Sequence, residues 1–169
     1  YYSTDSNGNI YRDGIEDKAH QASSWDEEFA MSPDDPYEFV FIDTTDGNPP
    51  ADDGSNLATI RIQGHDTHTK GVFFVAANIM IAGAGNAPAI SARRPDGTEE
   101  VITKVRHQGL FICSGMMDQR ANNTFYGAVY AGMGYGNFGS PEVYYDSRLS
   151  DGLFMPITSR VNLTLWKSF

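Results

Sequence analysis

The segment from Gly134 to Gly139 has the sequence GYGNFG, which fits the G-x-G-x-x-G pattern of dinucleotide-binding proteins. In those proteins a helix begins within the glycines, and its first amides bind the pyrophosphate. Here Ser-Pro-Glu-Val-Tyr-Tyr follows instead, which predicts a turn and a strand. We therefore interpret the glycines as a tight surface loop that projects Met133, Tyr135 and Phe138. The alternative is a wide connection whose aromatic rings fold back onto the core.

Oxygen-bearing side chains near the start of the chain have the spacing of calcium ligands. They match positions 1, 3, 5, 9 and 12 of a calcium-binding loop, and they are Asp5, Asn7, Asn9, Asp13 and Glu16. Position 6 of an EF-hand loop requires glycine, but Ile10 stands there, and no helix pattern precedes the segment. The sequence leaves two interpretations, a calcium site or an Asn-Gly hairpin with solvated acids. We therefore predict no cofactor, unless this segment binds calcium.

Two further groups contain side chains that could bind a metal or act as a nucleophile. His65, Asp66 and His68 are competent metal ligands, but on a strand the two histidines face opposite sides, so shared coordination would need a turn. Cys113 and His107 could form a thiolate pair, yet Cys113 lies in the apolar run GLFIC, where we expect a buried, unreactive thiol. No G-x-S-x-G nucleophile motif occurs. We predict that the chain is not an enzyme.

Acidic residues are concentrated in the first third of the chain. The net charge is −10, and residues 1–55 hold 14 acidic and 2 basic side chains. Such a field repels phosphate backbones, which argues against nucleic-acid binding. The longest apolar run, residues 71–83, is too short to cross a bilayer, so we expect no membrane insertion. A second acidic loop fits ordinary turn chemistry, and its acids are Asp43, Asp46, Asp52 and Asp53.

The first part of the chain predicts a hairpin, a helix and a strand. Asn7-Gly8 supplies the turn of a hairpin over residues 1–13. A capping-box pattern at residues 24–27 predicts a short helix over 24–31. The apolar run of residues 38–43 predicts a strand buried on both faces. We divide the chain into an acidic N-terminal arm, residues 1–36, and a β-rich domain, residues 37–169.

Three later segments share one plan, a glycine followed by an apolar strand. They are Gly71-Val-Phe-Phe-Val, Gly109-Leu-Phe-Ile-Cys and Gly127-Ala-Val-Tyr-Ala. Residues 58–63, 79–81 and 160–166 add further strand patterns, so the predicted fold is mainly β with one short N-terminal helix. The glycine spacing is too irregular for a strict repeat. Two architectures remain open, a β-helix-like coil and a β-sandwich of the same short strands.

The same strings resemble the C-terminal region of PilX-like accessory proteins of type IV pili. The resemblance spans roughly residues 37–160 and is carried by these segments: KGVFFVAANIMIAG (70–83), QGLFICSG (108–115), FYGAVYA (125–131) and PEVYYD (141–146). It implies an extracellular, β-rich part of a minor pilin or pilus-associated protein, whose N-terminal pilin-type helix this sequence does not show. It implies no catalytic residues.

These observations predict a structural or adhesive component of an extracellular filament or pilus. Its partners would be filament subunits or other copies of itself, and a surface ligand is a further candidate. Aromatic residues dominate the energetics of protein interfaces, and the candidates here are Tyr126, Tyr130, Tyr135, Phe138, Tyr144 and Tyr145. The alternative function is a calcium-stabilised binding module in which these tyrosines stack on carbohydrate.

Overall fold

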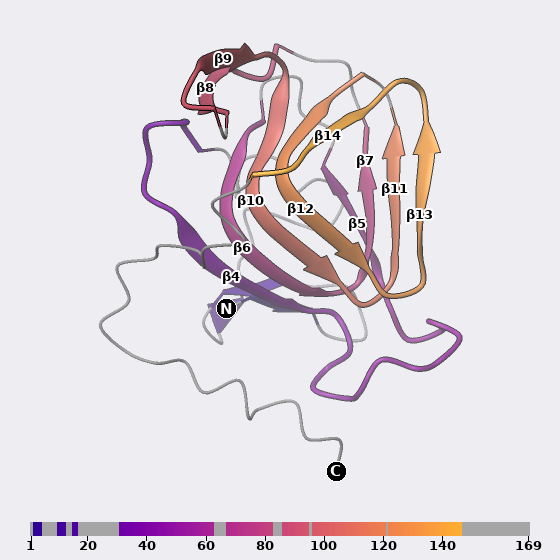
Figure 1. Cartoon of the computed structure of the whole chain (residues 1–169). Coiled ribbons are helices and arrows are strands. Elements are labelled where there is room, and N and C mark those ends of the chain that lie inside the picture. The colour runs from indigo at the N-terminus through magenta and orange to yellow at the C-terminus, as the bar shows by residue number, and fades with distance from the viewer. Residues whose placement is uncertain are drawn as a thin grey trace.

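The computed structural model describes residues 2–4, 10–12, 15–16, 31–62, 67–82, 86–94, 96–120 and 122–146 (Figure 1). Within these residues the fold is entirely β. The large sheet has the order β14-β12-β10-β6-β4-β1-β2-β3. Its strands are β1 (Tyr2–Thr4), β2 (Ile10–Arg12), β3 (Ile15–Glu16), β4 (Glu38–Asp43), β6 (Thr69–Ala76), β10 (Val105–Cys113), β12 (Thr124–Ala131) and β14 (Glu142–Tyr144).

A second sheet has the order β13-β11-β7-β5. It consists of β5 (Thr59–Ile62), β7 (Asn78–Ile81), β11 (Met116–Arg120) and β13 (Gly134–Phe138). Along the chain, β4, β6, β10 and β12 each lead into the next strand of this second sheet, and neighbouring strands in both series are parallel. The chain therefore winds as a parallel coil, which confirms the β-helix-like prediction over the sandwich (Figure 1).

Glycine aligns the coils at one position of the large sheet. Gly71, Gly109 and Gly127 are direct neighbours across β6, β10 and β12. Their φ angles lie between 131° and 146°, a conformation that side chains with a Cβ rarely adopt. A Cβ on Gly109 would lie 2.1 Å from the carbonyl oxygen of Gly71. The glycine that opens each predicted strand is thus a steric requirement of the stack.

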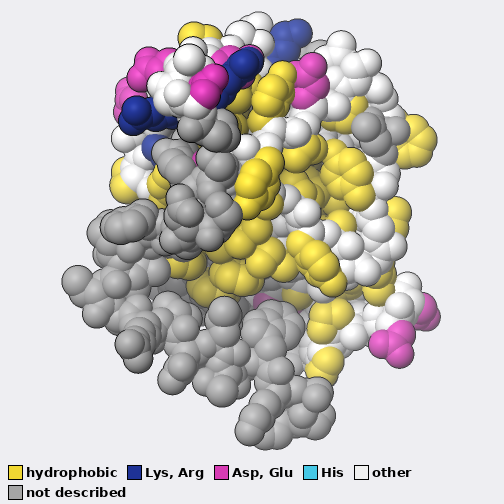
Figure 2. Space-filling model, viewed as in Figure 1, with side chains coloured by type: hydrophobic (Ala, Val, Ile, Leu, Met, Phe, Trp, Pro, Cys, Tyr) yellow, Lys and Arg dark blue, Asp and Glu magenta, His cyan; other side chains and the backbone are white. Residues whose placement is uncertain are grey.

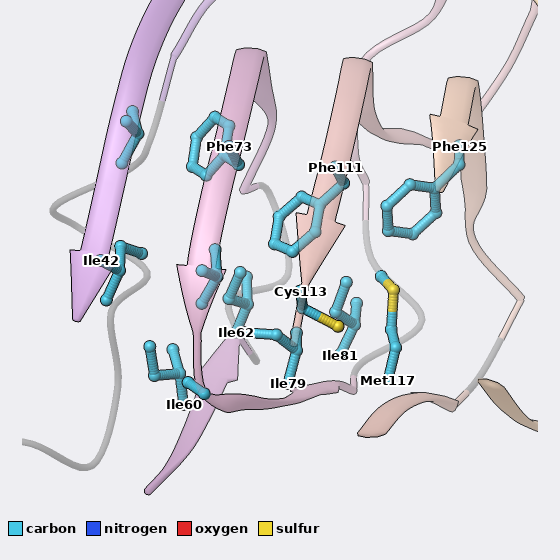
Figure 3. Close-up of a cluster of buried hydrophobic side chains, with 13 residues drawn as sticks. Ile42, Ile60, Ile62, Phe73, Ile79, Ile81, Phe111, Cys113, Met117 and Phe125 are labelled. Carbon is cyan, nitrogen blue, oxygen red and sulfur yellow. The ribbon is translucent and has the colours of Figure 1, made fainter. Parts of the chain in front are cut away.

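The core lies between the two sheets (Figure 3). Phe73 and Phe111 stack with ring centroids 5.3 Å apart, and Phe125 meets Phe111 edge-on at 6.4 Å. Ile79 and Met117 face them from the second sheet and are fully buried. Phe73 and Phe111 share one register position, and Ile79 and Met117 share another. Apolar residues thus stack on apolar residues from coil to coil, which is why short apolar strands suffice to build a continuous core.

A hairpin interrupts the coil between β7 and β10. It consists of β8 (Ile90–Arg93) and β9 (Glu99–Ile102), which pair antiparallel with each other. Its inner side chains form a second apolar cluster with residues of the large sheet. The cluster contains Ile90, Ala92, Ile102, Val105 and Tyr126, with Tyr144 packed against it.

Several predicted elements can be compared with the structure. The N-terminal hairpin is confirmed, because β1 and β2 pair antiparallel, and β1 also adds to β4 in the large sheet. Residues 38–43 form a strand, but burial on both faces is wrong because Phe39 and Phe41 are exposed. The surface loop predicted at 134–139 is also wrong, since Gly134–Phe138 is strand β13. The predicted helix at 24–31, apart from Met31, and the predicted strand at 160–166 lie outside the described residues.

None of the described residues belongs to a helix long and apolar enough to span a bilayer.

Candidate interaction surface at the last coil

The fold brings the six predicted contact residues to one end of the stack. Tyr126 and Tyr130 lie on β12, Tyr135 and Phe138 on β13, and Tyr144 and Tyr145 at or just after β14. These three strands are the last in the chain that the structure describes, and each stands at or next to the end of its sheet. Residues up to 19 positions apart in the sequence thus lie together on the last two described coils.

Their exposure divides these residues into contact candidates and core residues. Tyr130, Phe138 and Tyr145 are more than 60% exposed, and Tyr135 is 41% exposed. Tyr126 is buried against the β8–β9 hairpin, so we leave it out of the contact surface, and Tyr144 is half-buried there. Val143 on β14 is exposed and was missed by the sequence analysis. We call the exposed set the terminal surface: Tyr130, Tyr135, Phe138, Val143 and Tyr145.

Figure 2 shows hydrophobic side chains gathered on the side of the molecule where β12 and β14 lie nearest the viewer. Monomeric proteins seldom expose several large apolar side chains together unless they mark a contact site. Charged side chains gather in the same view around the β8–β9 hairpin, where Arg94 and Glu100 form an exposed ion pair of 2.7 Å. The apolar area is therefore bordered by charge on that side.

An outer apolar row leads across the large sheet to Tyr130. Register places Phe41, Phe74, Ile112 and Tyr130 side by side on β4, β6, β10 and β12. The Phe41 and Phe74 rings stack at 5.1 Å, and the two ends of the row are exposed. This row could have been predicted from the sequence. Three of its residues, Phe74, Ile112 and Tyr130, each stand three positions after an aligned glycine.

Tyr135 is held by a buried amide. Gln119 is fully buried at the register position where the preceding coils carry Ile62 and Ile81. The Tyr135 hydroxyl donates to Gln119 Oε1, and Gln119 Nε2 donates to the Asn123 side chain and, at 3.3 Å, to its carbonyl oxygen. Partial burial raises the pKa of Tyr135, so its hydroxyl stays protonated at neutral pH. The tyrosine is a fixed feature of the surface.

The edge of the second sheet at β13 lacks the usual protection against pairing. Among the described residues, β13 pairs with β11 on one side and with no strand on the other. Its sequence, GYGNF, contains no charged residue and no proline. Natural edge strands are usually guarded by charges, prolines or bulges. Within the described part of the chain, the outer amides and carbonyls of β13 pair with no strand, so this edge can accept one.

The other candidate sites do not assemble a reactive centre within the described residues. Cys113 is fully buried, and burial raises its pKa to about 11, which confirms the inert thiol. Burial lowers the pKa of His107 to about 3, so it is neutral, and the pKa of His68 is also lowered by burial. No group of three or more metal-ligating side chains occurs in the described ranges. His65 and Asp66 lie outside them.

The structure describes the acidic loop that follows β4, but only part of the candidate calcium loop. Asp43 accepts hydrogen bonds from the Thr45 amide at 2.8 Å and hydroxyl at 2.7 Å, and from the Gly47 amide at 3.0 Å. This is the turn chemistry predicted for that loop. In the candidate calcium loop, Glu16 belongs to β3, whereas Asp5, Asn7, Asn9 and Asp13 lie outside the described residues. The calcium site stays a prediction.

Within the described residues, the fold and the terminal surface define a class of protein, a parallel β-coil whose last two coils present aromatic side chains and an open strand edge. Comparisons of the chain with family models, with curated proteins and with solved structures find no match.

Proposed function

We propose that the protein is a structural component of an extracellular filament, of the kind formed by accessory proteins of type IV pili, and that it acts through protein–protein contacts at the terminal surface. The observation that carries this proposal is the placement of five exposed, large apolar side chains on the last three described strands or, for Tyr145, directly after the last one. Aromatic anchors of this type supply most of the binding energy in protein interfaces. Its partners are other subunits of the filament or further copies of this chain.

The resemblance to PilX-like proteins supports the proposal at the level of the coil. The strings that carry it coincide with β6 and β7, with β10, with β12 and with β14. They therefore include the residues that stack the coils, among them the three aligned glycines. A stack of coils with parallel strands is also a rigid scaffold on which a contact surface keeps its geometry.

The test is the state of association of the purified chain. Light scattering and electron microscopy over a range of protein concentrations should show defined oligomers or filaments. The double variant Tyr130→Ala, Tyr145→Ala should keep the fold, because both side chains are exposed, and should weaken association at least tenfold. Val101→Ala is the matched control, because Val101 is 70% exposed on β9.

A chain that stays monomeric at all concentrations and captures no pilus subunit would contradict the proposal. If the double variant and the Val101→Ala control associate equally well, the contacts do not lie at the terminal surface. The same measurements with calcium and with a chelator address the alternative binding module. That module requires calcium to raise the melting temperature, since an ion that binds only the folded state stabilises it.

A further inference from the structure

A short sequence motif lies at the corner between β11 and β12. Asn122, Asn123 and Thr124 form Asn-x-Thr, the acceptor signal for an N-linked glycan. Glycans of this kind are carried on the surface of exported proteins. A second copy of the signal, Asn162-Leu-Thr164, lies outside the described residues. Asn122 can carry a glycan only if the folded chain leaves its side chain accessible.

The side chain of Asn122 is exposed, and a hydrogen bond fixes its orientation. The Ser140 amide donates to Asn122 Oδ1 at 3.1 Å, and only the oxygen of a side-chain amide can accept this bond. Nδ2, the nitrogen that carries an N-linked glycan, has no hydrogen-bond partner within the described residues. The acceptor nitrogen is therefore free, on the branch of the amide that points away from Ser140.

The neighbouring asparagine has the opposite environment. Asn123 is 2% exposed. Its Nδ2 donates to the Arg120 carbonyl oxygen at 3.1 Å, and its Oδ1 accepts from Gln119 Nε2. Asn123 thus closes the corner of the coil from inside, whereas Asn122 makes a single hydrogen bond at the surface. Of the two, only Asn122 is available for modification in the folded chain.

A glycan on Asn122 would border the terminal surface on one side only. Asn122 bonds to Ser140, which follows Phe138 by two residues. Tyr130 lies near the other end of β12, six residues after Thr124, a distance of about 20 Å along the strand. A large, hydrated glycan would therefore keep the corner near Phe138 in solvent and leave Tyr130 free for contacts.

We propose that Asn122 is the acceptor of an N-linked glycan, attached by a transferase during export of the chain. The donor is an oligosaccharide joined through its anomeric carbon, C1, to a polyprenyl diphosphate. The Nδ2–C1 bond forms while the bond between C1 and the diphosphate oxygen breaks, and the diphosphate leaves with the electron pair of that bond. Nδ2 gives up one proton to a base of the transferase.

The burial of Thr124 places this transfer before folding. In the folded chain Thr124 is 4% exposed, and its amide donates to the Lys104 carbonyl oxygen at 2.9 Å. A transferase that recognises the hydroxyl two residues after the asparagine can reach it only before β12 pairs with β10. The inference rests on the proposed function in one respect, because it requires an exported chain, and otherwise goes beyond it.

Peptide mapping by mass spectrometry of the chain isolated from the cells that produce it tests the proposal. The peptide that contains Asn122 should carry the added mass of an oligosaccharide. This mass should be lost in Asn122→Gln and in Thr124→Val, and retained in Thr124→Ser, because serine keeps the hydroxyl. Asn86→Gln is the matched control, since Asn86 is also exposed but is followed by Ala-Pro, and it should leave the modification unchanged.

The location of the chain separates a failure of this inference from a failure of the proposed function. An unmodified Asn122 in chain recovered outside the cells would overturn the glycan and leave the proposed function standing. Unmodified chain found only inside the cells would contradict both. An oligosaccharide on Asn162 alone, or one that persists on Asn122 in the Thr124→Val variant, would also overturn the assignment.

Discussion

At the residue scale, the aligned glycines are the most demanding positions of the fold. Gly109→Ala introduces a Cβ 2.1 Å from the Gly71 carbonyl at a φ of 131°, so clash and backbone strain add together. We expect a loss of about 3 kcal/mol or more in the free energy of unfolding, measured by denaturant titration. Gly47→Ala is the control, because Gly47 also has positive φ but no atom near the added Cβ. Equal losses in the two variants would show that backbone strain alone, without the clash, accounts for the destabilisation.

His107 should make the stability depend on pH. Its ring lies among Phe73, Phe111 and Phe125, and Nδ1 bonds the Thr69 hydroxyl at 2.8 Å. Burial lowers its pKa from 6.5 to about 3 in the folded chain, with a smaller contribution from nearby His68. The unfolded chain therefore binds the proton first as the pH falls. Stability is full above pH 6.5 and is lost progressively between pH 6.5 and 3.

His107→Phe should reduce this acid sensitivity, because it removes the titrating group and keeps an aromatic ring of similar shape. The Thr69 hydroxyl retains the Arg106 carbonyl as a partner at 3.1 Å. Denaturant titrations at pH 7 and pH 4 provide the measurement. The unfolding free energy falls between pH 7 and pH 4, and in the variant this fall should be smaller by about 1 kcal/mol or more. His68, whose pKa is also lowered, accounts for part of the fall that remains. An unchanged drop would show that His107 does not control it.

At the element scale, the positions of most strands could be predicted from the sequence, but the exposure of their side chains could not. Alternation and apolar runs located β4, β5, β6 and β12 because those strands bury at least one face. β13 was missed because glycines at 134 and 136 normally mark a turn, whereas here their backbone pairs with β11. The six aromatic candidates were chosen by residue type, because aromatic side chains dominate the energetics of interfaces. Which of them face solvent depended on the β8–β9 hairpin, which covers Tyr126, and no local pattern shows that.

The hydrogen bond between Gln119 on β11 and Tyr135 on β13 should be measurable as a coupling energy. Gln119→Leu restores the apolar character of the preceding coils but removes the acceptor of the Tyr135 hydroxyl and the donor to Asn123. We expect a loss of about 1–3 kcal/mol, since buried polar groups lose their partners. Tyr135→Phe in the Gln119→Leu background should then cost less than in the unmodified chain. Strict additivity in this double-mutant cycle would contradict the link.

At the scale of the whole molecule, an insertion concealed the repeat from sequence analysis. Gly71 and Gly109 are 38 positions apart, but Gly109 and Gly127 are 18 apart, so the spacing looked irregular. The β8–β9 hairpin accounts for the 20 additional residues, because it lies between β7 and β10 and pairs only with itself among the described strands. The register of β6 with β10 is the same as that of β10 with β12. The coil therefore continues across the insertion.

Deletion of residues 83–102 should consequently leave the coil intact. It joins Ala82 to Thr103 and leaves three residues between β7 and β10, as many as separate β11 from β12. The far-ultraviolet circular dichroism should remain that of a β protein, and β6, β10 and β12 should keep their hydrogen-exchange protection. The melting temperature should fall, because Val105 and Tyr126 lose the apolar cover of Ile90 and Ile102. Val101→Ala, an exposed change on the hairpin, should not lower it. Loss of cooperative unfolding in the deletion variant would instead make the hairpin a required part of the core, and the coil would then not be an independent unit.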